Sequence, residues 1–227
     1  MKAASANGII QLRRVLAERF PQVPAWTEGV AARVHPCWPT GFKRLDESLQ
    51  GGLPTGAISE IVCDGGGAVF LRSLLGQAQQ RRQLMGLIDG CDGFDPAGMS
   101  AAALSRLLWV RCHNAEEAAK AADLLLRDRN LPLVALDLQM NPNGQLRKIS
   151  ATTWYRLQRI AQQSGTVLVT LTAAAMIPCA EVRVNLENRF TLADLDKEPE
   201  DIARELKFAV TRSHVSRETA TAIAEAG

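Results

Sequence analysis

Runs of apolar residues alternate with amphipathic stretches along most of the chain, and this alternation limits the possible fold more than any other feature. The runs include Ala57–Cys63 (AISEIVC), Leu131–Leu138 (LPLVALDL) and Gly165–Leu171 (GTVLVTL). Their apolar residues are largely consecutive, which is typical of strands buried on both faces of a parallel sheet. Segments with helical periodicity follow, among them Ala115–Arg127 and Ser150–Gln163. The sequence therefore predicts an α/β fold, with a mainly parallel central sheet and helices on both faces.

A length of 227 residues is enough for one full-sized α/β domain. We predict a core domain over residues 40–212, an N-terminal helix and linker over residues 1–39, and a C-terminal tail over residues 213–227. Residues 7–20 repeat apolar side chains at helical spacing, and Pro21 ends the helix. A single helix cannot form its own core, so we expect it to pack on its own domain, on a second copy or on a partner. The candidate residues for that contact are Ile9, Leu12, Arg13, Leu16 and Phe20.

Shorter elements fill the rest of the predicted core. Further helices are expected at Phe42–Leu49, Val69–Arg82 and Asp95–Leu104, and further strands at Leu84–Asp89, Leu107–Arg111, Ala180–Asn188 and Glu205–Thr211. Asn114 precedes the helix Ala115–Arg127 and is expected to be its N-cap. Residues 194–205 are acidic, and we expect either a solvated loop or a surface for a basic partner.

Several classes of protein are excluded by composition. No run of about 18 consecutive apolar residues is present, so no membrane-spanning helix is expected. The N-terminal residues lack the apolar segment of a signal peptide, which predicts a cytoplasmic protein. The five cysteines form no C-x-x-C pair, so neither zinc nor a disulfide framework is expected. The formal net charge of +2 favours neither binding nor exclusion of nucleic acid.

A glycine-rich turn follows the strand Ala57–Cys63, where a nucleotide-binding protein would have its phosphate loop. Such a loop has the pattern G-x-x-x-x-G-K-[S/T], in which the lysine binds the outer phosphates and the hydroxyl binds magnesium. The aligned residues here are Cys63, Asp64, Gly65, Gly66, Gly67, Ala68, Val69 and Phe70. Val69 replaces the lysine, Phe70 replaces the hydroxyl, and Asp64 adds a charge that opposes a polyanion. We therefore expect no cofactor, although the helix N-terminus after the glycines could still attract an anion.

Three segments together resemble the ATPase core of RecA-type recombinases, over residues 40–212. The first contains Thr40-Gly41-Phe42-x-x-Leu45-Asp46 and Gly51-Gly52-Leu53-Pro54-x-Gly56-x-Ile58-x-Glu60-Ile61. The second extends from Ile88-Asp89 to Asp95-Pro96, and the third is the apolar strand ending in Asp137. The resemblance implies a RecA-like fold with Asp137 at the Walker B position. It also implies that Cys91 stands where these enzymes have their catalytic glutamate. A neutral thiol is a poor general base, so it cannot replace that glutamate.

Among degenerate RecA-like proteins, the chain resembles the ImuA family. That resemblance implies a non-catalytic accessory protein of SOS-induced DNA repair and translesion synthesis. The implied partners are an ImuB-like polymerase, RecA or both, with self-association through the N-terminal helix as a further expectation. Two alternatives stay open at this point. One is a SulA-like inhibitor of cell division, which would bind FtsZ, and the other is an active RecA-like DNA-dependent ATPase.

A candidate surface for single-stranded DNA lies between Leu138 and Ala180, a stretch without aspartate or glutamate. Its candidate DNA-binding residues are Arg147, Lys148, Arg156 and Arg159. In RecA-like proteins the loop after the Walker B strand and the loop after the next strand line the path of the DNA. Here these loops are residues 139–149 and 172–183. Cations beside aromatic residues suit a single strand. Alternatively, Trp154, Leu157 and Ile160 form an ordinary core face of the helix Ser150–Gln163.

Overall fold

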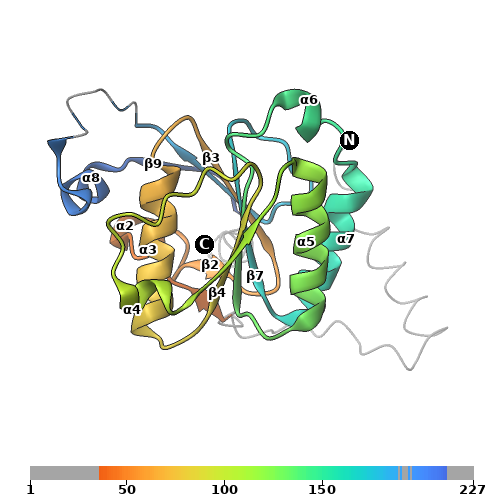
Figure 1. Cartoon of the computed structure of the whole chain (residues 1–227), viewed down its shortest axis with the longest axis horizontal. Helices are drawn as coiled ribbons and strands as arrows, with labels where there is room; N and C mark the ends of the chain where they lie inside the picture. The colour runs from red at the N-terminus through yellow and green to blue at the C-terminus, as the bar shows by residue number, and fades with distance from the viewer. Residues whose placement is uncertain (1–35, 189, 191–193, 195, 214–227) are drawn as a thin grey trace, which may run out of the picture. The chain divides into compact units, whose positions relative to one another are not determined.

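The computed structural model describes residues 36–188, 190, 194 and 196–213 (Figure 1). The predicted N-terminal helix lies outside these ranges, as do the residues from 214 onward. The five candidate docking residues of that helix are therefore also outside them, namely Ile9, Leu12, Arg13, Leu16 and Phe20.

A seven-stranded sheet forms the centre of the described domain, in the order β5-β4-β6-β7-β3-β8-β9. The strands are β3 (Ile58–Cys63), β4 (Met85–Asp89), β5 (Leu107–Arg111), β6 (Leu133–Asp137), β7 (Val167–Thr172), β8 (Val182–Leu186) and β9 (Phe208–Ser213). All neighbouring strands are parallel except β8 and β9. The predicted α/β class with a mainly parallel sheet is confirmed, and the architecture is consistent with a RecA-like core.

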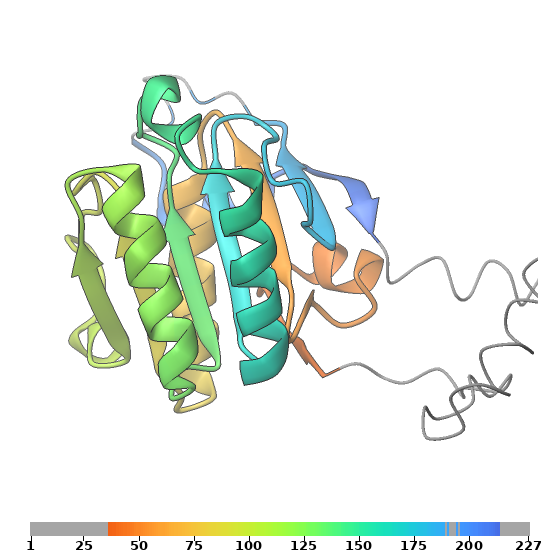
Figure 2. The same cartoon turned by 90° about the vertical axis from the view of Figure 1, so that its right-hand side faces the viewer.

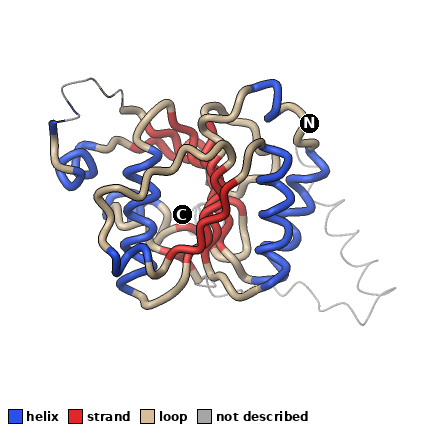
Figure 3. Tube along the Cα trace, viewed as in Figure 1, coloured by secondary structure: helices blue, strands red, loops and turns tan. Residues whose placement is uncertain are grey.

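Helices cover both faces of this sheet, as Figure 2 and Figure 3 show. On one face lie α3 (Gly67–Gln80) and α4 (Ala101–Leu104), and on the other lie α5 (Ala115–Asp128) and α7 (Ala151–Ser164). Successive side chains of a strand point to opposite faces, so each strand contributes to two cores. Leu87 packs in the α3 core and Ile88 in the α5 and α7 core. Consecutive apolar residues therefore bury both faces at once, as the sequence predicted.

Helix ends follow the expected local chemistry. Asn114 is the N-cap of α5, and its side chain accepts a hydrogen bond from the N–H of Glu117 at 2.9 Å. Ser150 caps α7 in the same way through the N–H of Thr153. Gly165 ends α7 with a left-handed backbone (φ 70°), a conformation that costs glycine little.

The predicted helix over Asp95–Leu104 is too long. Only Ala101–Leu104 is helical, and Ser100 is its N-cap. The Asp95 carboxylate accepts a hydrogen bond from the N–H of Ala97, which stabilises a turn. Gly98 then has φ 76°, so the backbone leaves the helical region before the final turn.

Short elements lie where the sequence predicted loops. A two-stranded sheet pairs β1 (Cys37–Trp38) with β2 (Leu53–Pro54), so two residues of the predicted linker pack beside the core. The short helix predicted over Phe42–Leu49 is present as α2 (Lys43–Ser48), whereas α6 (Asn143–Leu146) and α8 (Pro199–Glu205) lie in segments where no helix was predicted. Helices α6 and α8 have only four and seven residues, which gives too little periodicity for detection from sequence.

Candidate functional site

The residues predicted to be a degenerate phosphate loop form the tight turn between β3 and α3. Gly66 has φ 75° and is the N-cap of α3, and Gly65 has φ 148°. Helix α3 begins at Gly67, two residues before the predicted start at Val69. Left-handed backbone favours glycine, so Gly65 and Gly66 have a geometric role that is independent of any ligand.

Phe70, which the sequence places at the predicted hydroxyl position, has a completely buried side chain. Its ring stacks on Phe42 with a centroid distance of 5.7 Å and meets Phe208 edge-on at 6.5 Å. Val69, at the lysine position, is partly buried against the same core. Both positions therefore contribute to packing, while Asp64 and Ala68 are exposed.

Gln139 covers the start of α3, a contact that the sequence did not predict. Its amide group lies against Gly67, so closely that a Cβ at that position would overlap it. The Cys63 thiol donates to its Oε1 at 3.0 Å, and its Nε2 donates to Asp137 Oδ1 at 3.1 Å. On the other side of the turn, Phe190 lies beside Gly65 and Gly66. The turn is therefore filled by side chains of the protein itself.

The electrostatics of this edge oppose a polyphosphate. Burial, and then the charge of Asp89, raises the pKa of Asp137 above its ordinary value, although hydrogen bonds from Gln139 partly offset the shift. Burial raises the pKa of the Cys63 thiol to about 12, with further contributions from Asp137 and Asp64. Burial is the main cause of both shifts, and the neighbouring carboxylates add to them; a nucleotide would bring further negative charge to this edge.

Cys91, at the position predicted for a catalytic glutamate, has a thiol whose pKa is also raised. Burial is the main cause, followed by the charges of Asp89, Asp137 and Asp92. The neighbouring Asp92 turns away to Arg111, with Oδ1 2.5 Å from Nε and Oδ2 2.6 Å from the terminal Nη2. That contact lowers the pKa of Asp92, and its carboxylate is engaged on the surface.

Asp89 has a structural role at the end of β4. Its carboxylate accepts hydrogen bonds from the N–H groups of Gly93 (2.9 Å) and Phe94 (2.8 Å). It also accepts from the indole of Trp109 at 3.3 Å. The conformation of the turn after β4 therefore depends on this buried carboxylate.

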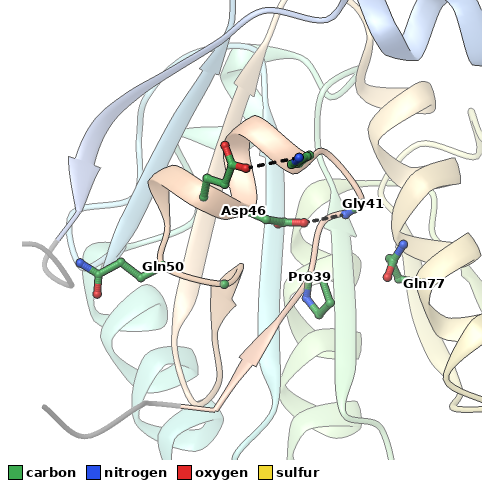
Figure 4. Close-up of a pocket in the computed structure, with 8 residues that line it drawn as sticks. Pro39, Gly41, Asp46, Gln50 and Gln77 are labelled. Carbon is green, nitrogen blue, oxygen red and sulfur yellow. Dashed lines mark hydrogen bonds and ion pairs between the residues drawn. The ribbon is translucent and has the colours of Figure 1, made fainter.

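Asp46 holds together the Thr40-Gly41-Phe42-x-x-Leu45-Asp46 segment through hydrogen bonds from its first two residues. Its Oδ1 accepts from the N–H (2.8 Å) and the hydroxyl (2.7 Å) of Thr40, and its Oδ2 accepts from the N–H of Gly41. A cavity of about 530 Å³ lies beside these residues and is also lined by Pro39 and Gln77 (Figure 4). The segment thus fixes the chain before α2, and the Asp46 carboxylate already accepts three hydrogen bonds, two from Thr40 and one from Gly41.

The four candidate DNA-binding residues are all exposed, but their surroundings differ. Arg147 and Lys148 follow α6, whereas Arg156 and Arg159 are on α7. Arg156 Nε lies 3.0 Å from Oδ1 of Asp123 on α5, so an acidic partner from another element offsets its charge. Trp154, Leu157 and Ile160 are buried and form the core face of α7.

Glu60 is a second residue whose role the sequence did not reveal. It is completely buried in β3, and its Oε2 lies 2.6 Å from Nε of Arg183. Its Oε1 accepts hydrogen bonds from the N–H groups of Met176 (2.7 Å) and Ile177 (3.1 Å). One carboxylate therefore holds the loop that follows β7, which is one of the two loops predicted to line a DNA path.

Within the described ranges, no group of three or more histidine, cysteine, aspartate or glutamate side chains is arranged to hold a metal ion. In the same part of the chain, no helix has the length and apolar character needed to cross a membrane. No protein-family model matches the chain, and no curated protein matches it.

Proposed function

We propose that the chain is a non-catalytic, RecA-like accessory protein of SOS-induced DNA repair and translesion synthesis. It acts in the cytoplasm by binding an ImuB-like polymerase, RecA or both, and it does not hydrolyse ATP. The filled turn between β3 and α3 supports this proposal most directly. There the amide of Gln139 lies against Gly67, where a nucleotide-binding protein needs open space, and the ring of Phe70 is buried in the core and not available to a ligand.

The loss of catalysis rests on three independent substitutions. An ATPase of this type needs a cation, a metal-binding hydroxyl and a carboxylate that activates water. The corresponding residues are Val69, Phe70 and Cys91. The loss of such groups lowers the rate by orders of magnitude, and Asp92, the carboxylate next to Cys91, is paired with Arg111.

A binding role follows from what the chain retains. The sheet, the helices on both faces and the buried carboxylates that hold its loops are all present without the catalytic groups. A fold without catalytic groups can still present surfaces that bind other proteins, because function depends on particular sites and not on the fold alone. The resemblance to the ImuA family points to the polymerase and RecA as the proteins bound.

The ATPase proposal is tested by measuring phosphate release with Mg²⁺, ATP and single-stranded DNA. We expect the same background rate for the wild-type protein and for Asp137→Ala. Turnover above background that Asp137→Ala abolishes would overturn the non-catalytic proposal, since Asp137 is at the Walker B position. Active RecA, assayed in parallel, confirms that the DNA and nucleotide are competent.

The partner proposal is tested by affinity capture with purified proteins. We expect the full chain to capture the ImuB-like polymerase, RecA or both from its own organism, and not to capture FtsZ. Capture of FtsZ alone would instead support the SulA-like alternative. If none of the three proteins is captured, the proposal is wrong.

A further inference from the structure

A groove separates the two loops that follow β6 and β7. One wall comes from α6 and the residues up to Ile149, the other wall comes from residues 174–178, and Trp154 of α7 lies beneath them. Its volume is about 460 Å³, within the range of roughly 300–1,000 Å³ that is typical of ligand sites. Much of its lining consists of Leu146, Ile149, Ala174, Ala175, Met176 and Pro178.

Buried polar contacts hold the wall formed by residues 174–178. Two successive N–H groups of this wall donate to Glu60, as described above, and Arg183 donates to the carbonyl of Ile177 at 2.7 Å. Arg183 is itself paired with Glu60. The wall therefore keeps its shape without a ligand, which reduces the entropy lost on binding.

The opposite wall is anchored independently. Asn141 is buried, and its Nδ2 donates to the carbonyl of Gly90 at 2.8 Å and to Oε1 of Gln145 at 3.2 Å. Leu146 and Ile149 are buried in the core that α5 and α7 share. Both walls are thus fixed to the sheet, and the groove between them is preformed.

The groove combines apolar walls with one free cation. Ala174, Ala175 and Pro178 are exposed, so the apolar surface is open to a partner. Arg147 lines the groove, is exposed, and has no ion pair with any residue that the structure describes. No aspartate or glutamate occurs between Leu138 and Ala180, so no acidic side chain of these loops competes for that guanidinium.

These properties suit a peptide better than a nucleic acid. Single-stranded nucleic acid needs several cations along its backbone and exposed aromatic rings on which bases stack. The aromatic residue of the groove, Trp154, is only 1% exposed, and Arg147 is the cation in the lining. Arg156 points to Asp123 on α5 and not into the groove.

We propose that this groove binds a short segment of a protein partner in which aliphatic side chains are flanked by glutamate or aspartate. The aliphatic side chains would pack between the two walls, and one carboxylate would pair with Arg147. The inference rests on the proposed function, since it assigns a docking site to the partner of an accessory protein. It goes further by naming the site and the chemistry of the segment that it binds.

Fluorescence anisotropy on the full chain tests the site with defined probes. The probes are a fluorescein-labelled amphipathic peptide with leucine on one face and glutamate beside it, a version with lysine in place of glutamate, and labelled oligo(dT). We expect the acidic peptide to bind. The lysine version should bind at least about tenfold more weakly than the acidic peptide. Failure of the acidic peptide to bind would overturn the proposal.

Two variants locate the binding. Ala175→Trp fills the groove from an exposed position, and Arg147→Glu reverses the charge, so each is expected to weaken binding of the acidic peptide by about tenfold or more. Arg159→Glu is the matched control, because it makes the same charge change at an exposed position outside the lining. Equal loss in the control would overturn the proposal. So would oligo(dT) binding that both groove variants abolish, because the groove would then be a nucleic-acid site.

The same variants separate this inference from the proposed function. If the wild-type chain captures the polymerase or RecA and both groove variants capture it equally well, the groove assignment is wrong and the accessory function stands. If the wild-type chain captures neither protein but the acidic peptide binds in the groove, the proposed partners are wrong and the groove assignment stands. If both groove variants lose capture and Arg159→Glu retains it, the groove assignment and the proposed accessory function are both supported.

Discussion

The thiol of Cys63 and the amide oxygen of Gln139 lie 3.0 Å apart, although the two residues are 76 positions apart in the sequence. Cys63 ends β3, and Gln139 follows β6 by two residues, so both lie at the carboxyl edge of the sheet. The same amide contacts Gly67 at the start of α3. A neutral side chain therefore closes the turn that would have to stay open for a nucleotide.

Phe70 is expected to stabilise the fold, whereas a phosphate loop would have a metal-binding hydroxyl at this position. Phe70→Ala should lower the free energy of unfolding by about 3–5 kcal/mol, because it leaves a cavity in a fully buried aromatic cluster. Urea denaturation followed by circular dichroism measures this loss. Tyr155→Ala is the control, since Tyr155 is 57% exposed, and it should change the stability by no more than about 0.5 kcal/mol. Similar losses in both variants would contradict the structural role of Phe70.

The contact between Gly67 and Gln139 can be measured by a double-mutant cycle. Gly67→Ala should destabilise the wild-type protein because its Cβ displaces the amide of Gln139. The same change in a Gln139→Ala background should cost little, which gives a coupling energy of about 0.5–3 kcal/mol. Gly76→Ala is the matched control in the same helix, where a Cβ meets nothing, and it should stabilise the protein by about 0.5–1 kcal/mol. A coupling energy near zero would mean that the amide does not hold the turn.

Glu60 is expected to be the most costly charge to remove. Glu60→Gln leaves the guanidinium of Arg183 partly buried without its counterion, and we expect a loss of about 3–5 kcal/mol in the free energy of unfolding. Hydrogen exchange should also become faster at the amides of Met176 and Ile177, which lose a charged acceptor. The control Glu116→Gln removes an exposed ion pair with Lys120 and should cost no more than about 1 kcal/mol. Unchanged exchange at both amides would show that Glu60 does not hold the loop.

Asp137 is expected to lower stability at neutral pH, opposite to the effect of an ordinary paired carboxylate. Its raised pKa means that the folded protein binds the proton more tightly than the unfolded chain, so this contribution to stability is lost as the pH rises through the folded value. Asp137→Asn removes the charge and should raise the free energy of unfolding at neutral pH. The gain should shrink as the pH falls from the raised folded pKa of Asp137 towards the ordinary aspartate value of 3.8, and it should be absent well below 3.8, where both states are protonated.

Denaturant titrations over a series of pH values measure that difference. Asp128→Asn serves as the control, because Asp128 is exposed and its hydrogen bond to Asn130 can be kept by an amide oxygen. A loss of stability in Asp137→Asn at neutral pH would show that the charge itself is needed at this position.

The sequence by itself determined the fold class, the N-cap of α5 and the absence of a cation and a hydroxyl in the turn. Consecutive apolar residues require a strand covered on both faces, and Asn114 caps a helix through an amide three residues away. The absence of lysine and hydroxyl at Val69 and Phe70 is likewise visible without coordinates. These features are local, because they depend on the backbone conformation of neighbouring residues and on side-chain type.

Only the tertiary structure decided which distant side chains meet. Glu60 and Arg183 are 123 positions apart, and they pair because β3 and β8 are adjacent and parallel with these two residues in register. Gln139 reaches Gly67 for a similar reason, since parallel strands bring their carboxyl ends to one edge of the sheet. Strand order and register result from the packing of the whole chain, so no local pattern could predict the filled turn or the groove beside Arg147.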